Sequence, residues 1–193
     1  MSEVTIKDID MLLDTYRIIY PVTDIDTLYA TYHVRYQKYC VDHKWEVPKL
    51  CFEYDEDDYL DSTRSFLIVN KLKRDKPVAT ARLISKKYIE DFSNLFEISR
   101  FCTLYGEHHY LPLIMVAALF KMTKDVPDPK WMAQLTPAFI RYLAKYGITF
   151  DIEVGEIDHH GLRKRMMAYD LGQMRQRIRD IRPDVAYLMA FYN

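Results

Sequence analysis

The chain has 193 residues, of which 49% are hydrophobic and 28% charged, with a formal net charge of −1 at pH 7. This composition is typical of one soluble globular domain with a sizeable core. The balanced charge gives no general attraction to nucleic acid or to an anionic membrane. The longest apolar run, residues 111–120, is too short for stable membrane insertion, which needs about 20 residues.

The first half of the chain predicts helices, strands and one long loop. In chain order these are a short helix (6–14), a strand (16–20), a helix (24–39), an irregular polar loop (40–64) and a hairpin of two strands (66–69 and 78–84). Thr23 and Asp24 are the expected N-cap residues of the long helix. A loop as long as 40–64 is more often functional or mobile than idle.

The second half continues the alternation of helices and strands. In chain order we predict a strand (97–102), a buried helix (113–122), a strand (131–135), a helix (137–146), a strand (148–154), a polar helix (171–182) and a last strand (185–191). Together these elements indicate an α/β fold on a mixed, largely antiparallel sheet.

Cysteine usage and the N-terminus bear on location. Residues 1–10 lack the apolar core of a signal peptide. The three cysteines, Cys40, Cys51 and Cys102, are odd in number and lack metal-ligand spacing, which predicts reduced thiols in a cytoplasmic protein.

Several familiar chemistries are poorly supported. The chain has five glycines and contains no glycine-rich phosphate loop or dinucleotide fingerprint. The adjacent pairs at 108–109 and 159–160 lack the spacing that lets two histidines share a metal on one helix face, so no metal site is predicted. Ser99 has no nucleophile-elbow motif around it.

The strand predicted at 97–102 carries Glu97 and Arg100 within a short apolar run. Burying a charge requires a partner or a purpose. The strand is therefore either an edge strand whose polar face meets water or part of a functional site.

Other charges at expected inward or cleft positions are Arg35, Glu53, Asp55, Asp58 and Arg82. As a set they suit a site that orients a zwitterion. The alternative is a network that locks the long loop onto the sheet, which we favour for Asp58.

Four motifs carry a resemblance. Arg35-x3-Tyr39-x5-Trp45, Glu53-x-Asp55-x2-Asp58, Arg82-Leu83 and Glu97-Ile98-Ser99-Arg100 resemble, in order and spacing, the signature of the autoinducer (acyl-homoserine lactone) synthases. Tyr39 departs from that signature, which usually has phenylalanine there. Residues 35–40, together with Gly155-x4-His160-Gly161-x-Arg163, look more like the long-chain N-acyl amino acid synthases, which make N-acyltyrosines.

Both families are similar to the GNAT acyltransferases in fold. The resemblance implies that residues 1–193 form one acyltransferase domain, with three layers, splayed strands in the sheet and helices on both faces. It implies that an α-amine, with tyrosine the favoured acceptor, attacks the thioester of an acyl-carrier protein. Glu97 would take the proton of the amine. Backbone N–H groups from Phe101 to Thr103 would hold the oxyanion if the strand bulges there.

The resemblance also implies roles for the other site residues. Arg35, Arg82 or Arg100 would clamp the carboxylate of the acceptor. The remaining members of the acceptor site would be Trp45, Glu53, Asp55 and Asp58. An apolar tunnel for the acyl chain would be lined by Phe101, Leu113, Val116, Trp131, Leu135 and Phe139, although such residues are more often ordinary core.

The donor is inferred from the turn at 104–109. GNAT enzymes that use coenzyme A grip its pyrophosphate with a glycine-rich turn before a helix, whereas this turn has one glycine and Glu107 would repel the anion. We therefore expect acyl-phosphopantetheine on an acyl-carrier protein as donor, and no separate cofactor. The expected docking patch is Arg163, Lys164, Arg165, Arg175 and Arg179, with a solvated helix face as the alternative.

Two further functions stay open. One is an acyl-homoserine lactone synthase that uses S-adenosylmethionine, whose sulfonium would suit the acidic run at 53–61. The other is a non-catalytic GNAT-like module that binds an acyl group or a carrier protein.

Overall fold

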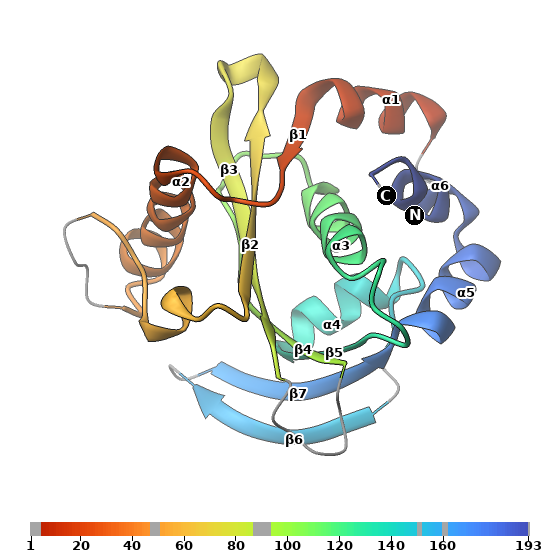
Figure 1. Ribbon diagram of the computed structural model, residues 1–193. Coiled ribbons are helices and arrows are strands. Elements are labelled where there is room, and N and C mark those ends of the chain that lie inside the picture. Colours follow the sequence, from red (N-terminus) through yellow and green to blue (C-terminus); the bar gives the residue numbers. More distant parts are fainter. Residues whose placement is uncertain (1–4, 47–50, 87–93, 150–151, 160–161, 193) are drawn as a thin grey trace.

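The computed structural model describes residues 5–46, 51–86, 94–149, 152–159 and 162–192, with β6 and β7 described by their backbone. Seven strands form one sheet in the order β1-β2-β3-β4-β5-β7-β6 (Figure 1). Their bounds are β1 (Tyr16–Ile19), β2 (Thr63–Asn70), β3 (Lys76–Ser85), β4 (Leu95–Thr103), β5 (Lys130–Leu135), β6 (Ile152–His159) and β7 (Leu162–Asp170). All neighbouring pairs are antiparallel except β4 and β5, which confirms the mixed, mostly antiparallel sheet.

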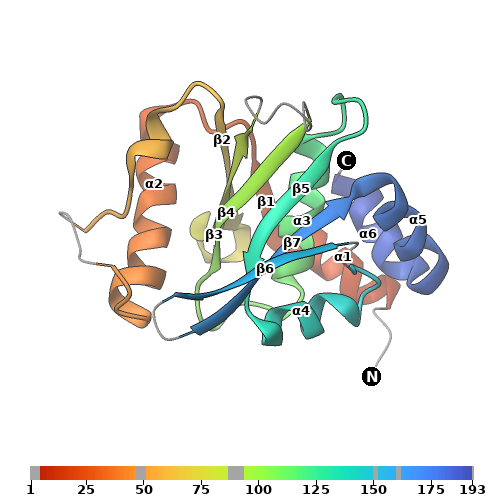
Figure 2. The same ribbon diagram turned by 90° about the horizontal axis from the view of Figure 1, so that it is seen from below.

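Helices cover both faces of the sheet, as expected (Figure 2). One face carries α2 (Ile25–Arg35), which continues as a π-helix, η1 (Tyr36–Asp42). The other carries α1 (Ile6–Thr15), α3 (Leu111–Met122), α4 (Pro137–Ala144), α5 (Leu171–Ile181) and α6 (Pro183–Tyr192). Two short 3-10 helices, η2 (Glu56–Tyr59) and η3 (Lys71–Lys73), lie in connections. Among the described residues, no helix has both the length and the apolar character needed to cross a membrane.

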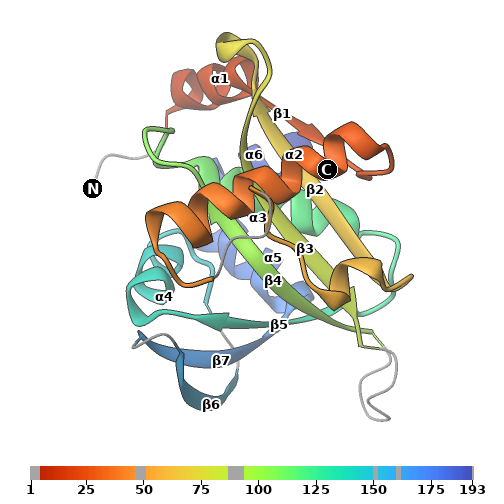
Figure 3. The ribbon, with the colours of Figure 1, turned by 90° about the vertical axis from the view of Figure 1, so that its left-hand side faces the viewer.

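Each face of the sheet has its own apolar core. The larger core surrounds α3, which is buried on nearly every side because it lies between the sheet and α6. The smaller core lies beneath α2 and consists of Val34, Leu67, Val69 and Cys102. Figure 3 shows α2 crossing in front of β2, β3 and β4. The strand β4 therefore separates the two cores, with Phe101 packed against the larger and Cys102 in the smaller.

Two irregularities in β4 create space for a site. Thr80 pairs with Cys102 but Arg82 pairs with Ser99, so β4 has one extra residue opposite Ala81. Arg100 has a φ of 53°, a left-handed conformation typical of such a bulge. This confirms the expected bulge. In addition, β4 pairs with β5 only as far as Ile98 and Ala133, and the two strands then diverge.

Three parts of the predicted secondary structure were wrong. The segment 185–191 is not a strand, because Val185, Leu188 and Met189 are buried at the i, i+3, i+4 spacing of helix α6. The strand predicted at 148–154 starts only at Ile152. The strand β7 was not predicted at all, since its first half is dominated by charged residues and lacks an apolar alternation. The helix predicted at 24–39 was right in place but changes to a π-helix after Arg35.

Candidate functional site

Three arginines and three carboxylates alternate in a closed ring of ion pairs beside β4. In order around the ring they are Arg35, Asp58, Arg82, Asp55, Arg100 and Glu53. They come from α2, the loop before β2, β3 and β4. Sequence reasoning expected these residues to lie together, and the structure brings them together.

Arg35 is the buried anchor of the ring. Its Nη1 and Nη2 donate to the two oxygens of Asp58 at 2.7 and 2.8 Å, and its Nε donates to Glu53. Burial by itself would lower the pKa of Arg35, but the two carboxylates outweigh it and hold the pKa above its ordinary value. The guanidinium is thus engaged by the protein and lies away from both cavities described below.

Arg82 is also engaged by protein acceptors. It donates to Asp55, to Ser99 Oγ at 2.9 Å and to Asp57 at 3.1 Å, and its Nη1 lies 3.1 Å from Asp58. Its side chain is 3% exposed. Arg35 and Arg82 therefore hold the loop before β2 on the sheet, and their expected role as a clamp for the acceptor is not supported by their burial and pairing.

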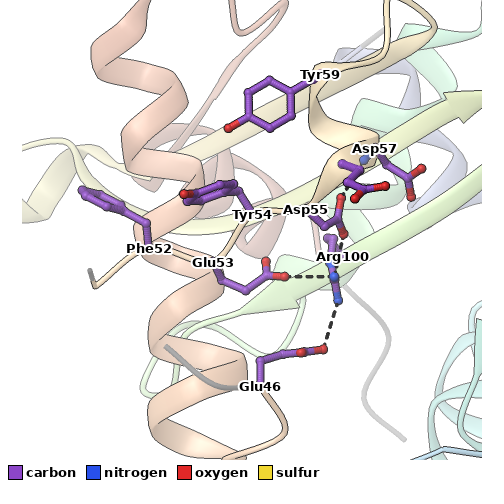
Figure 4. A pocket seen from close by; sticks show the side chains of 9 residues that line it. Glu46, Phe52, Glu53, Tyr54, Asp55, Asp57, Tyr59 and Arg100 are labelled. Atoms are coloured by element: carbon purple, nitrogen blue, oxygen red, sulfur yellow. Dashed lines mark hydrogen bonds and ion pairs between the residues drawn. The ribbon is translucent and has the colours of Figure 1, made fainter. Parts of the chain in front are cut away.

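Arg100 is the most accessible of the three arginines. Figure 4 shows it facing Glu46, Glu53 and Asp55. Its Nη2 lies 2.6 Å from Asp55 and 2.9 Å from Glu53, and its Nη1 lies 3.6 Å from Glu46. Among the described residues, its buried Nε–H has no acceptor. Glu46 lies beyond hydrogen-bond distance from Nη1, so the Nη1 end of the partly exposed side chain, and not the buried Nε, is the end that can meet a ligand.

The loop that supplies the carboxylates is fixed by its own caps. Asp55 is the N-cap of η2 and accepts from the backbone N–H of Asp57 at 3.1 Å, while Asp58 accepts from the backbone N–H of Asp55 at 2.9 Å. Burial by itself would raise the pKa of Asp55, but hydrogen bonds from Arg82 and Arg100 outweigh it and hold the pKa well below its usual range. Asp55 is therefore a carboxylate at neutral pH.

On one side of Arg100 lies a cavity of about 580 Å³, which we call the acidic pocket (Figure 4). Its lining consists of Glu46, Phe52, Glu53, Tyr54, Asp55, Glu56, Asp57, Tyr59 and Arg100. The rings of Tyr54 and Tyr59 meet edge to face with centroids 6.2 Å apart. Five carboxylates against one guanidinium, with three aromatic rings, make a pocket suited to a cation.

On the other side lies a cavity of about 620 Å³, which we call the strand-split cavity because it opens where β4 and β5 diverge. Its lining includes Tyr39 and Trp45 from the α2 side of the sheet, and Val116 and Phe139 from the α3 side. The cavity therefore passes between the two strands. It shares Glu46, Asp55, Asp57 and Arg100 with the acidic pocket, so the two cavities meet along β4.

Most of the predicted tunnel residues line the strand-split cavity, namely Phe101, Val116, Trp131, Leu135 and Phe139. Leu113 does not. It is fully buried in the larger core, and α3 turns Pro112, Val116 and Leu119 toward the cavity instead.

Glu97 lies outside the ion-pair ring. It lines the strand-split cavity, its side chain is 30% exposed, and one oxygen is 2.8 Å from Lys86 Nζ. The carboxylate thus borders the cavity without being buried in the ring.

Backbone groups of β4 face the split. The N–H of Leu104 donates to Val78 on β3 at 2.8 Å. Because successive residues of a strand direct their backbone groups to opposite sides, the N–H of Thr103 points away from β3. The carbonyl of Phe101 is directed the same way, since it accepts from Tyr39 Oη at 3.4 Å. Phe101 and Thr103 both line the strand-split cavity, where an oxyanion site was expected.

Sequence reasoning missed several residues of the acidic pocket. Glu46, Phe52, Tyr54, Glu56, Asp57 and Tyr59 line it but were not assigned to the site. Glu56 and Asp57 had a usable signal, since both are carboxylates of the acidic run at 53–61.

Two expectations about the donor change. Glu107 does not present a free charge, because it accepts from Lys73 at 2.7 Å, Asn70 at 2.9 Å and Tyr16 at 3.0 Å. Of the expected docking patch, Arg175 stacks over the ring of Phe120 at 4.8 Å and Arg179 donates to Gln176 at 2.8 Å. Arg163, Lys164 and Arg165 lie on β7, and their side chains are outside the described part of the structure.

No protein-family model and no curated protein sequence matches the chain. Solved structures do resemble it. BjaI, described as a CoA-dependent acyl-homoserine lactone synthase with SAM and isopentyl-CoA, gives a TM-score of 0.70 at 16% identity and covers 89% of each chain. TofI, in a ternary complex with an inhibitor and MTA, gives 0.66 at 15% identity, covering 89% of this chain and 99% of that one. An acyl-CoA N-acyltransferase from Pseudomonas aeruginosa gives 0.61 at 16% identity, covering 79% and 97%.

The fold is thus the one shared by acyl-homoserine lactone synthases and GNAT acyltransferases, as the sequence resemblance implied. At these identities the likeness shows the fold alone.

Proposed function

We propose that the protein is an N-acyltransferase that moves a long-chain acyl group from the thioester of an acyl-carrier protein to the α-amine of an amino acid, with tyrosine favoured. One observation carries this proposal. An acidic pocket and a cavity whose α3 side is apolar meet along β4, and Asp55 and Arg100 line both. Such a pair of cavities lets an amine and an acyl thioester approach the same strand from two sides.

The acyl chain occupies the strand-split cavity in this proposal. Val116, Trp131, Leu135 and Phe139 provide the apolar wall. The thioester carbonyl then lies near the bulge of β4, with backbone N–H groups of the Phe101–Thr103 segment as donors to the developing oxyanion.

The chemical step begins when the ammonium of the acceptor loses a proton to Glu97, directly or through a water. The amine nitrogen attacks the thioester carbon, the C–S bond breaks, and an amide and a thiol result. The nitrogen loses a second proton as the tetrahedral intermediate collapses. Of the two protons that leave the nitrogen, one goes to the leaving thiolate and the other is released to water, so charge and atoms balance. Glu97 suits this role because it borders the cavity and is not part of the ion-pair ring.

The acceptor occupies the acidic pocket. Its ammonium group lies among the carboxylates, its side chain against Phe52, Tyr54 and Tyr59, and its carboxylate against the Nη1 end of Arg100. Arg100 is the most exposed of the three arginines and lines both cavities, so the clamp is assigned to it.

A second candidate is an acyl-homoserine lactone synthase that uses S-adenosylmethionine. Arg35 and Arg82 pair with three of the five carboxylates, but the acidic pocket still has more carboxylates than guanidinium groups around it, which favours a cationic acceptor such as a sulfonium. BjaI, which shares the fold, was solved with SAM.

The choice of donor is also a proposal. With Glu107 neutralised by Lys73, the remaining support for a carrier protein is the single glycine, Gly106, in the turn before α3. BjaI is described as CoA-dependent, so coenzyme A is the donor to compare.

The test is incubation of the purified protein with acyl-carrier or coenzyme A thioesters and with either tyrosine or S-adenosylmethionine, followed by mass spectrometry of the products. An N-acyltyrosine formed from the carrier thioester supports the proposal. A lactone would overturn it in favour of the second candidate, and no product from any combination would favour a non-catalytic binding module.

A further inference from the structure

Tyr39 lies where the two substrates of the proposed reaction would meet. The π-helix η1 places its side chain in the wall of the strand-split cavity, and its carbonyl accepts from the backbone N–H of Trp45 at 2.8 Å. Its ring packs against Trp45 at 6.0 Å and lies under the guanidinium of Arg100 at 5.7 Å. Inserted turns of π-helix are frequently found at functional sites. The ring is thus held by two contacts and its backbone by a third, while the hydroxyl is directed at β4.

The hydroxyl reaches the bulged part of β4. Its acceptor is the carbonyl of Phe101, and the donor–acceptor distance of 3.4 Å is long for an O–H···O bond; the Cys102 thiol is a second and weaker partner. A bond of this length contributes little, so the hydroxyl can turn to a better acceptor at small cost. The backbone of Phe101 faces the split between β4 and β5, so the hydroxyl lies on the side that the thioester would approach.

The protonation state of Tyr39 suits a hydrogen-bond donor. Burial raises the pKa of Tyr39 well above its ordinary value, and the neighbouring Cys102 thiol acts in the same direction, whereas Arg100 and Arg35 oppose it. The phenol is therefore protonated throughout the neutral range. An uncharged O–H in a partly enclosed cavity is a strong donor to a negative oxygen.

We propose that the hydroxyl of Tyr39 donates a hydrogen bond to the thioester oxygen as it becomes an oxyanion, and so completes an oxyanion site with the β4 backbone. This role rests on the proposed acyl transfer. The hydrogen bond transfers no proton: the oxygen gains charge when the amine attacks and loses it when the C–S bond breaks. Tyr39 would thus stabilise the tetrahedral intermediate for any amine acceptor.

The test compares the wild type with Tyr39→Phe, which removes only the hydroxyl oxygen. The control is Tyr36→Phe on the same π-helix. The hydroxyl of Tyr36 is hydrogen-bonded with Cys51, and Tyr36 does not line the strand-split cavity. For each variant we would measure kcat and KM with an acyl thioester, affinity for the matching thioether, which has no carbonyl oxygen, and the thermal midpoint. Thioester hydrolysis without an amine serves as a second readout that is independent of the acceptor.

For Tyr39→Phe we expect kcat to fall about 10²-fold, with thioether affinity and thermal midpoint close to wild type. If Tyr39→Phe turned over as fast as Tyr36→Phe, the role would be overturned. A loss of thioether affinity in Tyr39→Phe as large as its loss of kcat would also overturn it, because the hydroxyl would then only shape the cavity. If the wild type neither transfers nor hydrolyses any acyl thioester, the proposed function itself falls, and this role falls with it.

Discussion

Arg35 and Asp58 face each other through two parallel hydrogen bonds of 2.7 and 2.8 Å, and both side chains are only 2% exposed. The pair joins α2 to the loop before β2. Neither residue lines the acidic pocket or the strand-split cavity. This geometry gives the pair a supporting role: it fixes the loop that carries Glu53 and Asp55 into the site.

Asp58→Asn should therefore destabilise the fold. It removes one charge from a buried pair and leaves Arg35 incompletely compensated, for which a loss of about 3 kcal/mol in the free energy of unfolding is expected. Urea denaturation measures this loss. Asp61→Asn, at an exposed position in the same loop, is the matched control and should stay within about 0.5 kcal/mol of wild type. Equal stabilities of the two variants would show that the buried pair does not hold the loop.

Glu97→Gln tests the proposed base. The amide keeps the size of the side chain but cannot accept the proton of the ammonium, so turnover should fall about 10²-fold or more while the fold stays intact. Steady-state rates and the thermal midpoint check both parts. Lys86→Met is the control, because it removes the 2.8 Å ion pair and leaves the carboxylate in place. If Glu97→Gln retained the wild-type rate, Glu97 could not be the base.

Val116→Phe tests the acyl cavity. Val116 lines the strand-split cavity and is buried, so a larger ring there should occupy space that a long acyl chain needs. With a mixture of short and long acyl donors, we expect the products to shift toward shorter chains, as read by mass spectrometry. Leu113→Met, on the same helix but within the core, should leave the distribution unchanged. If Leu113→Met shifted the product chain lengths and Val116→Phe did not, the acyl chain would not lie in the strand-split cavity.

The sequence predicted well what periodicity and local motifs determine. The alternation in β3 gave a central strand, and the charges at Arg35, Asp55 and Arg100 gave members of the ring. The apolar spacing of α2 gave the helix but not its buried face, because Ile25 and Tyr29 are exposed. Helix α3 shows where this information ends. Because α3 is apolar on all sides, its sequence does not tell which side chains face the core and which face the cavity, and Leu113 was assigned to the wrong one.

The partners of the charged residues could not be predicted either. Sequence spacing did not reveal that Glu97 pairs with Lys86 outside the ring, or that Arg35 and Arg82 are buried under protein carboxylates. The pairings of Arg35 and Arg82 depend on how the loop before β2 folds over the sheet, which the caps of η2 help to fix. The pairing of Glu97 depends on the register of β3 and β4. The same holds for the acidic pocket, whose aromatic walls come from a segment without periodicity.

Stability in acid tests the electrostatics of the ring through Asp55. Hydrogen bonds from Arg82 and Arg100 outweigh the effect of burial and hold the pKa of Asp55 below its ordinary value in the folded state. The unfolded chain therefore binds this proton at a higher pH than the folded protein does. Stability from Asp55 is present at neutral pH and should be lost as the pH falls below about 4.

Urea denaturation between neutral and acidic pH measures how steeply the free energy of unfolding falls with pH. Asp55→Asn should be less stable at neutral pH and lose stability less steeply in acid, whereas Glu56→Gln, an exposed neighbour on η2, controls for changes in this turn. If Asp55→Asn kept the slope of the wild type, its carboxylate would not be held in the ring as the ion pairs with Arg82 and Arg100 require.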